Sequence, residues 1–135
     1  MITFNNEIIR KLIHLSSLIV PLHLYYFDKT LTLYILIPIA IAFLLIDFLR
    51  INNPKVENIY SFFFNSITRS EEKKSLTGAS YVFISSCLII LLFDKEIAII
   101  SLLIMTISDT MAALIGRKYG SIRIGKKSIE GSMAF

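Results

Sequence analysis

Four long stretches without an acidic or strongly basic side chain constrain this sequence more than any other feature. They cover residues 12–27, 30–46, 75–93 and 97–108, and the fourth continues past Asp109 to Gly116. A membrane-spanning helix needs roughly 20 mostly apolar residues, with about 17 tolerated. Only 18% of the 135 residues are charged, whereas about a quarter are charged in a soluble domain. The sequence predicts an all-α, polytopic membrane protein with about four transmembrane helices.

The predicted spans lie at about 11–27, 30–47, 75–93 and 97–116, within one membrane domain over 1–135. A soluble helical protein with a very apolar core is the alternative, but a domain of this size has too little interior to bury four such segments. A secretory signal peptide does not fit the first stretch. It lacks a small-residue cleavage site, and another apolar stretch follows it directly.

The number of lysine and arginine residues is alternately higher and lower in the successive segments on the two sides of the predicted membrane. The successive segments outside the spans hold two, one, five, one and five of the 14 basic residues. The positive-inside rule therefore places the N-terminus, the second loop (48–74) and the final segment (117–132) in the cytoplasm. The net charge of +4 reflects this topology. It does not indicate nucleic-acid binding, because no basic face with interleaved aromatic residues is present.

Local features refine this picture. Pro21 and Pro38 fall within the first two spans and are expected to kink them. Cys87 is the single cysteine, so no disulfide framework is expected.

The second loop is predicted to form an amphipathic helix at the cytoplasmic interface, because its apolar residues recur at helical spacing. These residues are Val56, Ile59, Tyr60, Phe63 and Ile67.

Asp109 is the residue that most directly suggests a functional site. A carboxylate at membrane depth costs several kcal/mol unless it is paired, solvated or bound to a cation. Ala112, Ala113 and Gly116 follow on the same helical face, at spacings of three, four and seven residues. Such small residues serve either close helix packing or close approach of a phosphate or metal to the backbone. The acid favours the second interpretation.

Basic residues, glycines and serines alternate in the segment after the fourth span. Flexible backbone, exposed amides and cations together favour polyphosphate binding. A basic anchor with a loose loop is the alternative, but it would not require the glycines and serines. The candidate phosphate-binding residues are Gly116, Arg117, Gly120, Lys126, Lys127 and Gly131.

Two further clusters are predicted on the same side of the membrane. Glu7, Arg10, Lys11 and His14 share one face of the first helix. A routine Glu7–Lys11 pair is the simple explanation of that face. The other cluster precedes the third span and contains Arg69, Glu72, Thr77 and Gly78.

Four blocks of this sequence resemble the polyprenol kinase family of dolichol kinases, phytol kinases and CTP-dependent diacylglycerol kinases, which is related to phosphatidate cytidylyltransferases. The blocks follow the order of that family across nearly the whole chain. They are Arg10-Lys11-Leu12-Ile13-His14-Leu15, then Arg69-x-x-Glu72 with Leu76-Thr77-Gly78-Ala79-Ser80-Tyr81, then Ser108-Asp109-Thr110-Met111-Ala112-Ala113-Leu114-Ile115-Gly116-Arg117-Lys118-Tyr119-Gly120, then Lys127-Ser128-Ile129-Glu130-Gly131-Ser132-Met133-Ala134-Phe135.

The resemblance implies CTP-dependent phosphorylation of a membrane lipid alcohol at the cytoplasmic face. Asp109 is expected to hold Mg²⁺, with Glu72 as a second candidate ligand. Glycines 116 and 120 are expected to let the phosphates approach the backbone. The expected phosphate clamp consists of Arg10, Lys11, Arg117, Lys126 and Lys127, and the weaker site candidates are His14, Arg69, Thr77, Gly78 and Glu130.

Two alternatives stay open at this stage. A phosphatidate cytidylyltransferase would use the same clamp and metal but would make a CDP-lipid, and a non-catalytic or truncated membrane protein would do neither. Family members usually run longer, with further membrane helices and a late Asp-Asn element. The apolar end at Phe135 therefore leads us to expect a C-terminally incomplete chain. The sequence does not specify the lipid alcohol, and a homo-oligomer is neither required nor excluded.

Overall fold

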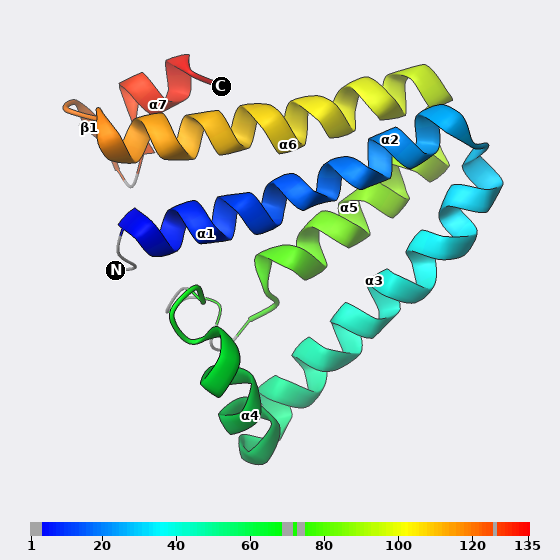
Figure 1. Ribbon diagram of the computed structural model, residues 1–135, viewed down its shortest axis with the longest axis horizontal. Helices are drawn as coiled ribbons and strands as arrows, with labels where there is room; N and C mark the ends of the chain where they lie inside the picture. The colour runs from blue at the N-terminus through cyan, green and yellow to red at the C-terminus, as the bar shows by residue number, and fades with distance from the viewer. Residues whose placement is uncertain (1–3, 69–71, 73–74, 126) are drawn as a thin grey trace.

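The computed structural model describes residues 4–68, 72, 75–125 and 127–135. These residues form helices and one small β-hairpin, so the predicted all-α class is confirmed. Figure 1 shows their arrangement. In chain order the elements are α1 (Phe4–Leu15), the 3₁₀ turn η1 (Ser16–Leu18), α2 (Ile19–Tyr26), α3 (Lys29–Asn52), α4 (Pro54–Phe64), α5 (Gly78–Leu92), α6 (Lys95–Lys118), β1 (Arg123–Ile124), β2 (Lys127–Ser128) and α7 (Ile129–Met133).

The first apolar stretch forms α1, η1 and α2 in succession. Pro21 cannot donate a backbone hydrogen bond, and its ring clashes with the carbonyl four residues earlier. The chain takes a 3₁₀ turn at that level, and the Ser17 hydroxyl donates to the His14 carbonyl at 2.7 Å. The irregularity expected at Pro21 is therefore the 3₁₀ turn Ser16–Leu18, about one helical turn before the proline. By contrast, α3 continues as an α-helix through Pro38.

Side-chain caps start the next two helices. The Leu31 amide donates to Asp28 Oδ1 at 2.6 Å at the start of α3, and the Lys55 amide donates to Asn53 Oδ1 at 3.0 Å at the start of α4. Such caps satisfy backbone donors that have no partner within the helix. Pro54 at the first position of α4 suits a site where no donor is needed. The helix predicted in the second loop is therefore confirmed.

Within the part of the chain that the structure describes, three helical segments are long and apolar enough to cross a membrane by length and composition. They are Phe4–Tyr26, Lys29–Asn52 and Lys95–Lys118. The third predicted span, 75–93, is an apolar helix of 15 residues, Gly78–Leu92. That helix is about 22 Å long, whereas the hydrocarbon core of a bilayer is about 30 Å thick. A fourth crossing by α5 stays a prediction.

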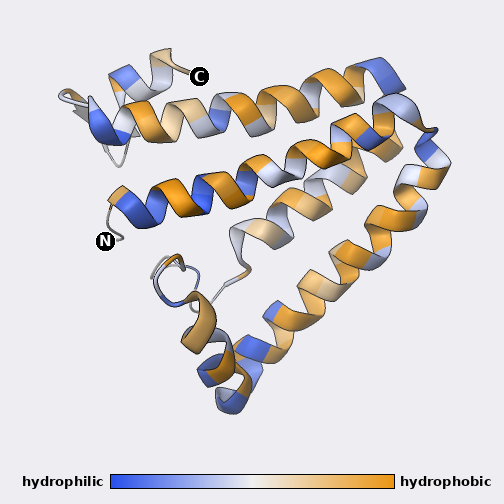
Figure 2. Cartoon of the chain, in the orientation of Figure 1, coloured by the Kyte–Doolittle hydropathy of each residue, from blue (hydrophilic) through white to orange (hydrophobic). Residues whose placement is uncertain are grey.

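The helices pack around a small apolar core. The α1–α2 segment lies beside α6, α3 packs on α5, α5 also contacts α6, and α7 lies on α6 (Figure 1). Figure 2 shows hydrophobic residues along the helices, many of which are exposed. Exposed apolar surface on this scale is typical of a protein that meets lipid or other protein. The buried core consists of Val20, Leu24, Leu36, Ile90, Ala98 and Leu102.

The two ends of the bundle differ in what they hold. At one end, the turn before α3 meets the turn before α6, where Lys29 Nζ donates to the Phe93 carbonyl at 2.7 Å. The other end holds the start of α1, the segment between α4 and α5, and the end of α6 with α7 (Figure 1). The charged clusters predicted to share one side are therefore near one another. Their cytoplasmic orientation stays a prediction.

Candidate functional site

An ion pair between α1 and α6 forms the centre of the candidate site. Lys11 Nζ lies 2.5 Å from Asp109 Oδ2, although the two residues are 98 positions apart in the sequence. The Lys11 side chain is 9% exposed, whereas that of Asp109 is 54% exposed. The acid expected to carry the site is thus paired with a cation, as its cost at membrane depth requires. More than half of its surface still remains accessible.

Further contacts surround this pair on the same two helices. His14 Nε2 lies 3.7 Å from Asp109 Oδ2, and the Ser17 and Thr106 hydroxyls are 3.3 Å apart. These residues lie at successive turns of the face of α1 that meets α6. Helical periodicity predicted which side chains share this face of the first helix, but only the tertiary structure shows that the face contacts α6.

A second ion pair joins the outer ends of the same two helices. Arg117 Nη2 lies 3.6 Å from Oε2 of Glu7, which is fully buried. Arg117 is at the C-terminal end of α6, where a cation is favoured by the helix dipole. The residue expected to clamp phosphate therefore stands next to the Lys11–Asp109 pair along the α1–α6 contact.

Arg10 faces the segment between α4 and α5. Its guanidinium donates from Nη1 to Glu72 Oε2 at 2.8 Å and to the Ile67 carbonyl at 3.1 Å, and Nη2 donates to Glu72 Oε1. Gly78 lies against this group, because a Cβ on it would stand 2.8 Å from Arg10 Nη2. Both carboxylate oxygens of Glu72 are engaged by Arg10. A role of Glu72 as a metal ligand stays a prediction.

A buried polar network lies between α3 and α5, and sequence reasoning missed its centre. Asp47 Oδ2 accepts hydrogen bonds from the Thr77 amide (2.7 Å), the Thr77 hydroxyl (3.0 Å) and the Ser80 hydroxyl (2.6 Å). Arg50 Nη2 donates to Asp47 Oδ1 at 3.1 Å and to the carbonyls of Glu72 and Ser75. Thr77, predicted near the site, therefore belongs to this network.

The sequence places Asp47 at the last position of the predicted span 30–47 and Arg50 in the loop that follows, because the apolar stretch ends just before them. The helix α3 instead continues to Asn52, which turns both side chains inward. The spacing of an acid and a base by three residues was the only signal in the sequence.

The glycines of the C-terminal segment allow α7 to dock on α6. A Cβ on Gly131 would stand 2.8 Å from the Ala112 carbonyl oxygen and 2.9 Å from Gly116 Cα. A Cβ on Gly120 would stand 2.2 Å from the Gly116 carbonyl oxygen. The small face predicted on α6 is thus filled by the protein itself, which supports the packing interpretation of these residues. A contact of Gly116, Gly120 and Gly131 with phosphate stays a prediction.

Glu130 closes the loop that leads into α7. Its Oε1 accepts hydrogen bonds from the Ser121 hydroxyl and from the backbone amides of Ser121 (2.9 Å) and Ile122 (3.2 Å). The hydrogen bond from the Ser121 side chain, together with the backbone donors, lowers the pKa of Glu130 to about 2. Glu130 therefore stabilises the loop as a carboxylate.

Part of the predicted phosphate clamp cannot be placed. Arg69 and Lys126 lie outside the described residues, and of Lys127 the structure describes only the backbone, in β2. Among the described residues, no three His, Cys, Asp or Glu side chains form a metal-binding group. Mg²⁺ is commonly held by one or two carboxylates together with substrate phosphates. The exposed carboxylate of Asp109 fits that requirement, whereas the carboxylate of Glu72 is 14% exposed and bound by Arg10.

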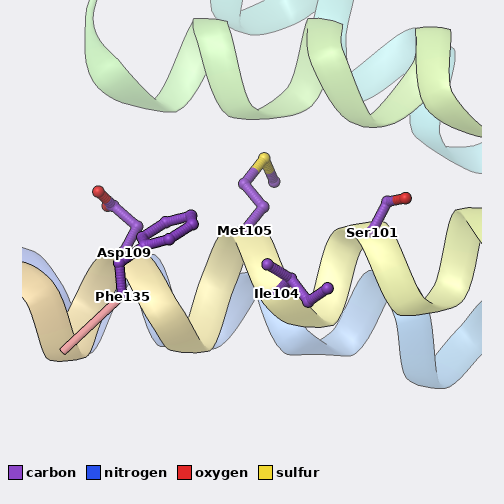
Figure 3. Close-up of a pocket in the computed structure, with 5 residues that line it drawn as sticks. All are labelled: Ser101, Ile104, Met105, Asp109 and Phe135. Atoms are coloured by element: carbon purple, nitrogen blue, oxygen red, sulfur yellow. The ribbon is translucent and has the colours of Figure 1, made fainter. Parts of the chain in front are cut away.

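A hollow of about 450 Å³ opens beside Asp109. Figure 3 shows Ser101, Met105 and Asp109 pointing to the same side of α6. Ile104 and Phe135 complete its lining. The site therefore combines an accessible carboxylate, a buried lysine and an apolar hollow that reaches along a helix able to span a membrane.

The known proteins that are similar to this chain include the following three. An uncharacterized protein of Rickettsia prowazekii is 36% identical over 98% of the chain and 66% of its own length. CTP-dependent diacylglycerol kinase 1 of Saccharomyces cerevisiae is 31% identical over 96% of the chain and 46% of its own length. The Schizosaccharomyces pombe protein of that name is 32% identical over 64% of the chain and 41% of its own length.

No protein-family model matches the chain, and no solved structure matches it. The chain spans between 41% and 66% of the length of the three relatives. The matched proteins that have a described activity are CTP-dependent kinases of a lipid. These similarities place the chain among distant homologues of CTP-dependent diacylglycerol kinases and support its relation to lipid kinases in general.

Proposed function

We propose that this protein transfers the γ phosphoryl group of CTP to the hydroxyl of a membrane lipid alcohol, at the cytoplasmic face. The observation that carries the proposal is the Lys11–Asp109 pair, which lies between two apolar helices and beside an apolar hollow. The distant homology to CTP-dependent diacylglycerol kinases supports CTP as the donor and a lipid as the acceptor. Diacylglycerol and polyprenols are both lipid alcohols of the required kind.

The reaction needs positioning and charge neutralisation more than covalent chemistry. The lipid oxygen bonds to the γ phosphorus, the bond from that phosphorus to the bridging oxygen of CDP breaks, CDP leaves, and the hydroxyl proton passes to water. Lys11 supplies a cation next to Asp109, and Arg117 supplies another at the end of α6. Both groups would favour the triphosphate at this end of the bundle, as charge-assisted hydrogen bonds do elsewhere.

Asp109 would hold Mg²⁺, which when bound neutralises charge on the phosphate oxygens. The same carboxylate already orients the Lys11 ammonium, since the two are in hydrogen-bond contact. Arg10 has a different part in the proposal. Its bidentate contact with Glu72 holds the segment between α4 and α5 against α1, so that Arg10 positions the site and Lys11 meets the phosphate.

Labelled CTP tests the reaction. The protein is reconstituted in vesicles that contain diacylglycerol or a polyprenol, and CTP is supplied with the label either at the γ phosphate or at the α phosphate. We expect the γ label, and not the α label, to appear in extracted lipid. The α label in lipid would identify a cytidylyltransferase, and lipid without either label would contradict the proposed function.

The variant Asp109→Asn tests the site. It preserves the size of the side chain but removes its charge, so we expect the γ-label transfer to be lost. The matched control is Asp94→Asn, which removes the same charge from the other end of the same helix and should leave the transfer rate unchanged. Full activity of Asp109→Asn would rule out a metal site at this carboxylate.

A further inference from the structure

We infer that the hollow beside Asp109 is the seat of the lipid alcohol's hydrocarbon chain, with its hydroxyl held at the Asp109 end. This inference rests on the proposed function and adds the location of the acceptor. The hollow is lined by Ser101, Ile104, Met105, Asp109 and Phe135. Its occupant is a lipid hydrocarbon chain rather than a nucleotide, for reasons of lining, position and length.

The lining changes from charged to apolar along the helix. Asp109 is the charged residue of the hollow, and its carboxylate is accessible and paired with Lys11. Ile104, Met105 and Phe135 offer hydrocarbon and sulfur surface, which favours an alkyl chain and gives a triphosphate no partner. An amphiphile with one polar end and one long apolar tail matches this order of side chains.

The hollow also runs in the direction of a lipid tail and has the length of part of one. Ser101 and Asp109 are eight residues apart on α6, which corresponds to roughly 12 Å along the helix axis. The helix Lys95–Lys118 is long and apolar enough to span a membrane. A chain that follows α6 from Asp109 toward Ser101 therefore runs along the apolar part of the helix, away from the end that carries Arg117 and Lys118. The volume of about 450 Å³ lies within the usual range of small-molecule sites, about 300–1,000 Å³.

A second hollow on α6 provides a comparison, because its lining does not include Asp109. It has a volume of about 340 Å³ and is lined by Tyr25, Lys95, Glu96, Ile99 and Ile100. It lies at the opposite end of α6, away from the Lys11–Asp109 pair. Its apolar surface is comparable, so general affinity for lipid would fill both hollows. Recognition of a lipid alcohol for phosphorylation would favour only the hollow that ends at Asp109.

Photolabelling tests the inference independently of catalysis. The probe is a diacylglycerol with a diazirine midway along one acyl chain, added to the full chain in phosphatidylcholine vesicles without CTP. We expect adducts to concentrate at residues 101–105 of α6. A phosphatidylcholine with the same diazirine chain, which has no free hydroxyl, should label the exposed faces of α6 without that preference.

Two exposed isoleucines provide a matched pair of variants. Ile104 lines the hollow and is 49% exposed, and Ile107 lies outside it and is 46% exposed. Ile104→Trp should fill the hollow, abolish the preferential labelling and raise the KM for diacylglycerol by about tenfold or more, with the KM for CTP unchanged. Ile107→Trp should change none of these quantities.

The outcomes separate the inference from the proposed function. Equal labelling by the two probes, or labelling that Ile104→Trp leaves intact, would overturn the location of the acceptor even if γ-label transfer occurs. Preferential labelling at 101–105 without any transfer from CTP would support the lipid seat and contradict the kinase.

Discussion

Asp47 and Asp109 are both carboxylates on long apolar helices, but the protein surrounds them in opposite ways. The carboxylate of Asp47 is buried and accepts hydrogen bonds from Thr77, Ser80 and Arg50. The carboxylate of Asp109 is 54% exposed and contacts Lys11 from one side. A buried charge persists when its hydrogen bonds are complete. An exposed charge with one neighbouring cation can still accept a ligand.

The comparison distinguishes a structural acid, Asp47, from the proposed functional acid, Asp109. The Asp47 network fixes where α5 begins relative to α3, and through the contact of Arg50 with the Glu72 carbonyl it also fixes the segment that Arg10 binds. The network therefore stabilises the segment that Arg10 contacts in the candidate site. Asp109 itself lies on α6 where the apolar hollow and the basic face of α1 meet.

Loss of the buried carboxylate should have the largest effect on stability. Asp47→Ala leaves Arg50 buried without its acid, and breaking such a pair costs about 3–5 kcal/mol of the free energy of unfolding. Denaturant titration in detergent micelles measures this loss. Asp47→Asn keeps one acceptor and should cost less. A loss under about 1 kcal/mol for Asp47→Ala would show that the network is not structural.

In contrast to Asp47→Ala, Asp109→Asn should affect the rate of γ-label transfer more than the free energy of unfolding. We expect the rate of γ-label transfer to fall by about 10²–10³-fold, the usual cost of removing one charge-stabilising group from an active site. The free energy of unfolding should change less than in Asp47→Ala, because asparagine still accepts a hydrogen bond from Lys11. The two measurements on the same purified variant test the distinction directly. A large loss of stability with an unchanged rate would reverse the two assignments.

The docking of α7 on α6 should be sensitive to one methyl group. Gly131→Ala would place its Cβ 2.8 Å from the Ala112 carbonyl oxygen. Such overpacking against backbone typically costs about 1–3 kcal/mol. Thermal unfolding monitors the change, with Ser132→Ala on the exposed side of the same helix as the control. In Gly78→Ala, the obstructing atom is the flexible end of Arg10, so the cost should be smaller.

The smallest effect concerns pH. The pKa of Glu130 is about 2 in the folded chain, against an ordinary value of 4.5, so the carboxylate favours the folded loop above pH 4.5. That contribution falls as the pH drops from 4.5 toward 2. Hydrogen exchange of the Ser121 and Ile122 amides, corrected for the intrinsic pH dependence, should accelerate across this window. Glu130→Gln should remove the dependence, and its persistence in that variant would assign it to another group.

Much of the helical framework could be predicted from the sequence. Uncharged stretches long enough to cross a membrane located three long helical segments, and the 3.6-residue period placed Glu7, Arg10, Lys11 and His14 on one face of α1. The end of α3 was harder to predict, because Asp47 and Arg50 resemble the charged border of a span. They continue the helix because Thr77 and Ser80, 30 and 33 residues away from Asp47, satisfy the carboxylate.

The sequence by itself determined the class of protein and the alternation of basic segments, and it identified Asp109 as the candidate for a site, because hydropathy and charge act locally along the chain. The tertiary structure decided which acid each cation meets. It paired Lys11 with Asp109 on α6, and it paired the neighbouring Arg10 with Glu72 between α4 and α5. It also showed that Gly116 and Gly131 lie where α7 packs against α6. Long-range pairing depends on how whole helices pack against each other, and no local pattern contains that information.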